Sequence, residues 1–116
     1  MALLEILDRE SLGDFLSSPH AVLVLAKSDC AACAAWSEEL SGFLAALPEG
    51  DRLGAVRYGK LLLNQPGLGF FKKPSLWLKD VRDLPFTALY VGGEYSRGFI
   101  GGGQTRLLNR LNRMLS

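Results

Sequence analysis

The stretch from Ala21 to Cys33, AVLVLAKSDCAAC, restricts the possible folds of this chain more than any other. Its first six residues are all apolar, which indicates a strand buried on both faces of a sheet. Apolar residues then recur at helical spacing from Cys33 to Leu47, and Pro48 and Gly50 are expected to end that helix. The stretch therefore predicts a strand that passes through a short loop directly into a long helix.

The rest of the chain continues the alternation of strands and helices. We expect further strands at 2–7, within 54–63, at 86–91 and at 94–100, a short helix before Pro19, short helical pieces within 65–83, and a helix at 104–115. Gly92-Gly93 predicts a tight turn between the last two strands. Strands joined by helices give a parallel half and the hairpin an antiparallel half. The prediction is an α/β domain over residues 1–116, with a mixed central sheet of four to five strands and helices on both faces.

Charge and hydropathy exclude several classes of partner. The chain has 116 residues, with 13 Lys+Arg against 12 Asp+Glu. This balance gives no electrostatic reason to expect nucleic acid or an anionic membrane as a partner. No apolar run reaches the length of a membrane span, and the first residues lack the basic start and long apolar stretch of a secretory signal. We therefore expect a cytoplasmic protein, in a compartment that keeps thiols reduced.

The only two cysteines, Cys30 and Cys33, lie three positions apart. They are interpretable as a redox pair, as part of a metal site, or as two small buried residues without a function. A zinc or iron–sulfur site needs about four ligands. The one histidine, His20, falls in an expected surface turn, so a metal would have to be shared with a second chain. We expect no metal and no bound cofactor.

The order of elements, with Cys-x-x-Cys between a buried strand and a long helix, resembles the thioredoxin-fold family. The segment DLPFTALYVGGEYSRGFIGGG, residues 83–103, is similar to the last hairpin of that family. It has a proline that opens the strand, Pro85, a glycine turn, and a glycine after the second strand. The spacing from Cys33 to Pro85 also matches. The resemblance covers nearly the whole chain, and most firmly residues 21–115.

The resemblance implies thiol–disulfide exchange, with Cys30 as the attacking nucleophile and Cys33 as the resolving thiol. The start of a helix suits this chemistry, because its unpaired N–H groups and dipole favour a thiolate. The resemblance also implies a cis peptide bond between Leu84 and Pro85, beside which the Leu84 backbone pairs with an extended substrate segment. The implied partners are protein disulfides and, as electron donor, a reductase or a low-molecular-weight thiol. We expect a monomer.

The chain departs from the thioredoxin pattern at several positions near the cysteines. Asp29 replaces the usual tryptophan before the first cysteine; we expect it to cap the helix and to make Cys30 less acidic than its counterparts. Lys27 is a second charged residue that could tune the nucleophile. The buried acid of the family aligns with Val24. These departures keep open a second interpretation, a thioredoxin-fold interaction module whose cysteines are vestigial or structural.

Overall fold

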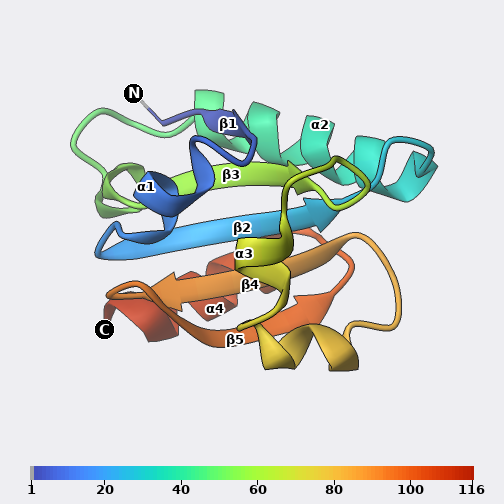
Figure 1. Cartoon of the computed structure of the whole chain (residues 1–116). Coiled ribbons are helices and arrows are strands. Elements are labelled where there is room, and N and C mark those ends of the chain that lie inside the picture. Colours follow the sequence, from blue (N-terminus) through green and yellow to red (C-terminus); the bar gives the residue numbers. More distant parts are fainter. Residues whose placement is uncertain (1) are drawn as a thin grey trace.

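The computed structural model describes residues 2–116; Met1, the first residue of the expected domain, lies outside this range. Strands and helices alternate along most of the chain, and the last two strands form a hairpin (Figure 1). The elements are β1 (Leu4–Leu7), α1 (Leu12–Leu16), β2 (His20–Ala26), α2 (Ala31–Ala45), the 3-10 helix η1 (Arg52–Ala55), β3 (Arg57–Leu62), α3 (Gly69–Lys72), the 3-10 helix η2 (Leu76–Asp80), β4 (Phe86–Val91), β5 (Glu94–Ile100) and α4 (Gln104–Leu115).

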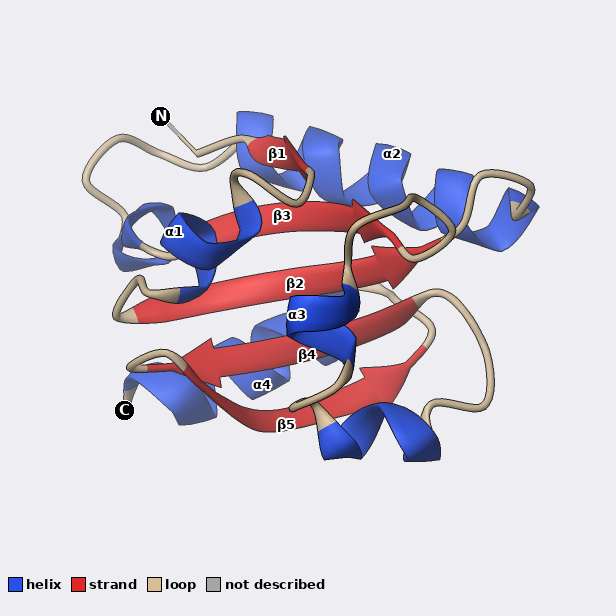
Figure 2. Ribbon diagram, viewed as in Figure 1, coloured by secondary structure: helices blue, strands red, loops and turns tan. Residues whose placement is uncertain are grey.

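The five strands form one mixed sheet in the order β1-β3-β2-β4-β5. β1 and β2 both pair with β3 in parallel, whereas β4 pairs antiparallel with β2 and with β5. Helices cover both faces of this sheet, with α3 in front of it and α4 behind it in Figure 2. The expected α/β architecture is therefore confirmed, and the number of strands is five.

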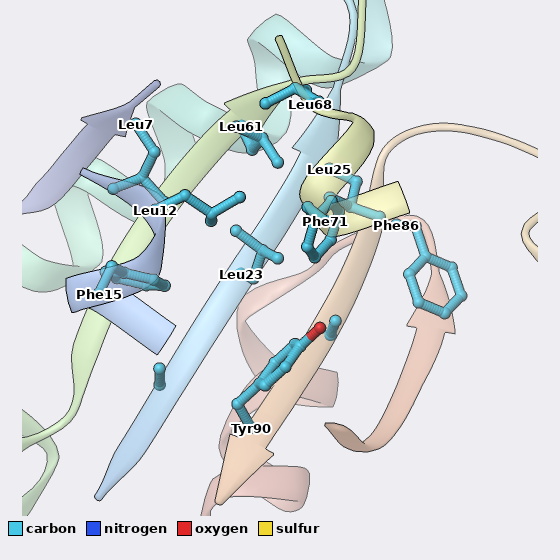
Figure 3. Close-up of a cluster of buried hydrophobic side chains, with 12 residues drawn as sticks. Leu7, Leu12, Phe15, Leu23, Leu25, Leu61, Leu68, Phe71, Phe86 and Tyr90 are labelled. Atoms are coloured by element: carbon cyan, nitrogen blue, oxygen red, sulfur yellow. The ribbon is translucent and has the colours of Figure 1, made fainter. Parts of the chain in front are cut away.

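β2 lies in the middle of the sheet and supplies side chains to both cores, which explains its continuous apolar run. Ala21 to Ala26 are completely buried. Because side chains alternate along a strand, Leu23 and Leu25 pack on the face that α1 and α3 cover (Figure 3), and Val22 and Val24 on the face of α2 and α4. The α2 side chains Trp36, Leu40 and Leu44 complete the second core.

The least regular part of the chain, 65–83, forms the expected short helical pieces on either side of Pro74. Aromatic packing holds the second piece, η2, against the sheet. The Trp77 ring stacks on Tyr95 with centroids 4.1 Å apart and on Phe86 with centroids 5.8 Å apart. Offset or stacked aromatic pairs of this kind contribute about 0.5–1.5 kcal/mol each beyond their buried area. This cluster fixes the start of the segment that leads from η2 to β4.

Two strands end, and a helix and a third strand begin, at the same end of the molecule. In Figure 1 the ends of β2 and β3 and the starts of α2 and β4 all lie on the right. Parallel strands β2 and β3 end there because they run in the same direction, and β4 starts there because it is antiparallel to β2. This topology brings residues near 27–33, 63 and 84 to the same edge of the sheet.

We predict that Gly59→Ala destabilises the protein by about 1–3 kcal/mol, because the β3 position has no room for a side chain. A Cβ at Gly59 would lie 2.6 Å from Leu7 Cδ1 and 2.8 Å from Phe15 Cε1. The matched control is Gly42→Ala within α2, where no atom lies within 4 Å of the added carbon. There, alanine should raise stability by about 0.5–1 kcal/mol, as it does in helix interiors. Urea unfolding of both variants tests this; a Gly59→Ala protein as stable as wild type would contradict it.

Candidate functional site

Cys30 is the N-cap residue of α2, and its own sulfur caps the helix. Its backbone is extended, with φ −121° and ψ 106°, and its Sγ accepts a hydrogen bond from the Cys33 N–H at 3.1 Å. The first N–H groups of a helix have no backbone acceptor, so a side-chain atom at this position takes that role. The sulfur of Cys30 therefore lies at the positive end of the helix dipole.

The prediction that Asp29 caps this helix is wrong. Asp29 is exposed and lies one residue before the N-cap, which Cys30 occupies. The extended residue immediately before the first helical residue provides the cap, and at that position the chain has a thiol. The expected effect of Asp29 on Cys30, which depended on capping, loses its basis. Lys27 is also exposed, and its influence on Cys30 remains a prediction.

Cys30 and Cys33 are joined by a disulfide, with their Cα atoms 5.2 Å apart. A spacing of three residues places both side chains on one side of α2, one turn apart. Their surroundings differ, because Cys30 is half-buried at the helix start whereas Cys33 is only 1% exposed and packs beneath it. Cys30 is thus partly exposed to solvent, and Cys33 is almost completely buried.

The segment before β4 lies beside the disulfide. The Leu84–Pro85 peptide bond is cis, and the Leu84 carbonyl oxygen lies 3.8 Å from Cys30 Sγ, although 54 residues separate them. Pro85 is buried and has no N–H to donate. The structure therefore brings together four of the predicted site residues, Cys30, Cys33, Leu84 and Pro85.

A buried threonine that the sequence analysis missed links the elements of this site by hydrogen bonds. Thr87 Oγ1 accepts a hydrogen bond from Trp36 Nε1 at 3.2 Å and donates one to the Gly101 carbonyl at 2.9 Å. The Gly101 N–H in turn donates to the Pro85 carbonyl at 2.6 Å. A Cβ at Gly102 would overlap the Trp36 indole, so that glycine allows the close packing. These contacts join α2, β4 and the loop after β5.

The sequence carried only a weak signal for this arrangement. Trp36 follows Cys33 by one turn, and a single threonine interrupts the apolar strand FTALYV. Either feature is equally typical of ordinary core packing. Their hydrogen bond joins residues 51 positions apart, and periodicity does not predict such a pairing.

The position that aligns with the buried acid of thioredoxins holds an aliphatic side chain in this protein. Val24 is completely buried, and its neighbours in register are Lys60 on β3 and Thr87 on β4. No carboxylate therefore comes from β2 at this point, and valine has no group that could carry a proton to or from Cys33.

A groove of about 520 Å³ lies along the same end of the molecule. Residues from the loop after β2, the end of β3, α3 and the η2–β4 segment form its walls. They are Lys27, Leu63, Lys72, Leu78, Lys79, Val81, Arg82, Asp83 and Leu84. Leu84 is common to the groove and to the surroundings of Cys30.

Residues 2–116 contain neither a cluster of metal-ligating side chains nor a membrane-spanning helix. In that range, no three or more His, Cys, Asp or Glu side chains are grouped so that they could hold a metal ion. Among the same residues, no helix combines the length and the apolar character needed to cross a membrane.

No family model and no curated protein sequence matches the chain. Solved thioredoxin structures are similar to it over nearly its full length. Thioredoxin f2 of Chlamydomonas reinhardtii has 19% identity and a TM-score of 0.71, and the match covers 96% of this chain and 95% of that one. The short form of thioredoxin f from spinach chloroplast has 14% identity and a TM-score of 0.74, with 99% and 96% covered.

A structure of ferredoxin:thioredoxin reductase in complex with thioredoxin f2 gives 13% identity, a TM-score of 0.73, and coverage of 98% and 96%. Identities this low establish the architecture alone. The chain has the thioredoxin fold, with a Cys-x-x-Cys disulfide at the start of α2.

Proposed function

We propose that this protein is a thiol–disulfide oxidoreductase that exchanges disulfides with protein substrates through Cys30 and Cys33. The observation that carries the proposal is the asymmetry of the pair: Cys30, whose sulfur caps α2, is partly exposed, and Cys33 is buried one turn later. Unpaired N–H groups and the helix dipole stabilise a thiolate at the first position. The thiolate is the reactive form in exchange.

In the reduced protein, the Cys30 thiolate attacks one sulfur of a substrate disulfide. The substrate S–S bond breaks, its second sulfur leaves as a thiolate, and Cys30 holds the first in a mixed disulfide. Cys33, deprotonated in turn, attacks Cys30 Sγ and releases the first substrate sulfur. The substrate gains two electrons, and the protein is left with the Cys30–Cys33 disulfide that the structure contains. A reductase or a small thiol then returns the two electrons.

The proton on Cys33 must leave without the help of a buried carboxylate, since Val24 occupies that place. Its acceptors are the substrate thiolate released in the first step and water at the open side of the disulfide. Proton transfer by a positioned group contributes about 10²–10⁴-fold to a step. We therefore expect attack by Cys33 to be the slower of the two exchange steps.

In this proposal, the Leu84 backbone orients an extended substrate segment. Its carbonyl oxygen lies 3.8 Å from Cys30 Sγ. The next residue, Pro85, has no N–H and therefore cannot donate a backbone hydrogen bond. Main-chain pairing of this kind recognises an extended shape rather than particular side chains. The thioredoxin f2 of one similar structure is in complex with a reductase, which supports a reductase as electron donor here.

A second candidate function, a thioredoxin-fold interaction module with structural cysteines, is favoured by one observation. Cys33 is only 1% exposed, and β2 supplies the aliphatic Val24 where a buried acid would otherwise stand. Burial in apolar surroundings makes a cysteine less reactive. The two functions differ in whether Cys33 ever attacks Cys30, so the fate of the mixed disulfide distinguishes them.

We predict that Cys33→Ser accumulates a covalent complex with a disulfide substrate, because the mixed disulfide forms but is not resolved. Reduction of insulin disulfides by this variant should fall by at least about a hundredfold. Nonreducing gel electrophoresis and mass spectrometry measure the complex. Cys30→Ser is the matched control: it should lose the activity equally and trap nothing. If neither variant traps substrate and the wild-type protein does not reduce insulin, the interaction module is the correct interpretation.

We also predict that Thr87→Val destabilises the protein by about 1–3 kcal/mol and slows insulin reduction, although valine has nearly the same shape. The substitution leaves the Trp36 indole N–H and the Gly101 carbonyl without their buried partner. Thr105→Val, at an exposed position of α4, should change stability by less than about 0.5 kcal/mol. Urea unfolding and insulin assays of both variants test this. Equal stability of the two variants would show that the hydrogen bonds of Thr87 contribute nothing.

A further inference from the structure

The groove beside the disulfide carries a charge pattern that the exchange steps do not use. Four cationic side chains line it against one carboxylate: Lys27, Lys72, Lys79 and Arg82 against Asp83. The whole chain has 13 Lys+Arg and 12 Asp+Glu. The excess of positive charge is therefore local to the groove and does not reflect the composition of the protein.

Most of this charge is not neutralised by the protein itself. Within residues 2–116, both ion pairs belong to Arg57, which is not in the groove. Lys72 Nζ donates a hydrogen bond to the Leu63 carbonyl, but that contact leaves its charge uncompensated. The Asp83 carboxylate accepts a hydrogen bond from the Leu84 N–H at 2.9 Å, and its single negative charge stands against the four positive charges of the lining.

The remaining lining of the groove is apolar. Leu63, Leu78, Val81 and Leu84 are half-buried and pack against the core that α3 covers. A hydrophobic floor with charges around it suits a peptide segment that combines an apolar side chain with carboxylates. Nucleic acid fits less well, because the residues that line the groove include no aromatic ring on which a base could stack.

We propose that this groove binds an acidic segment of the protein substrate, with an apolar residue in the groove and carboxylates facing Lys27, Lys79 and Arg82. The inference rests on the proposed function, and it names the substrate class. Leu84 belongs both to the groove and to the surroundings of Cys30 Sγ. The acidic segment therefore lies next to the substrate cysteine that Cys30 attacks. Complementary charges on the groove and on the acidic segment raise the rate of association as well as the affinity.

Binding is tested apart from chemistry with three fluorescent peptides of one length and the oxidised full-length protein. Each contains leucine and serine beside two glutamates, two glutamines or two lysines. At low salt we expect the acidic peptide to bind about tenfold more tightly than the neutral one, and the basic peptide more weakly than either. At about 1 M salt, where the Debye length is about 3 Å, the difference should largely disappear.

Two charge-reversed proteins locate the effect. Lys79→Glu combined with Arg82→Glu should abolish the preference for the acidic peptide or invert it. The matched control, Arg97→Glu combined with Arg113→Glu, changes the net charge equally on β5 and at the end of α4. Arg113 lies in the last turn of α4, and the C-terminus that follows is at the opposite end of the molecule from the start of α2 (Figure 1). The control should bind all three peptides as wild type does, and urea unfolding shows whether both proteins are folded.

Disulfide exchange is measured separately, with three peptides in which cysteine replaces the serine. Each peptide is used as the dimer that a disulfide between two identical copies forms. The reduced protein should reduce the acidic dimer about tenfold faster than the neutral one at low salt. Equal binding of the three peptides, or an effect of equal size in the control protein, would overturn the groove proposal whatever the exchange rates. Tighter binding of a single-stranded oligonucleotide than of the acidic peptide would overturn it as well. Selective binding without any exchange would support the groove and contradict the proposed function.

Discussion

One hydrogen bond at the start of α2 sets the position and the surroundings of the Cys30 sulfur. The Cys33 N–H donates to Cys30 Sγ, which makes the sulfur itself the cap of the helix. An atom in that position meets both the unpaired N–H groups and the helix dipole, and a negative charge there is stabilised by typically 0.3–1 kcal/mol for the dipole alone. The same turn of helix buries Cys33, so one backbone geometry gives the pair its unequal exposure.

The rest of the fold holds this geometry in place from three sides. β2 is buried on both faces and delivers the chain to the helix start at the edge of the sheet. The Trp36–Thr87 hydrogen bond fixes α2 to β4, the strand that Leu84 and Pro85 precede. Stacking of Trp77 on Tyr95 anchors η2, and so the segment that forms one wall of the groove. The disulfide, the Leu84–Pro85 segment and the groove are thus positioned by separate parts of the core.

What could be predicted from the sequence was local in character. Continuous apolar residues, helical spacing and a glycine turn indicated β2, α2 and the last hairpin, and the structure confirms them. The proximity of Leu84 to Cys30 came from the resemblance, since no periodicity joins residues 54 positions apart. The Asp29 cap was wrong by a single position, because backbone conformation decides which residue is the N-cap. Thr87 and the groove were missed because they exist only once separate segments are packed together.

The most direct test of the account is the alkylation of the fully reduced protein with a limiting amount of iodoacetamide, followed by peptide mapping. We expect Cys30 to be modified at least about tenfold faster than Cys33, because thiolate character and exposure together govern reactivity. Equal modification of the two cysteines, or faster modification of Cys33, would contradict the assignment of Cys30 as the nucleophile.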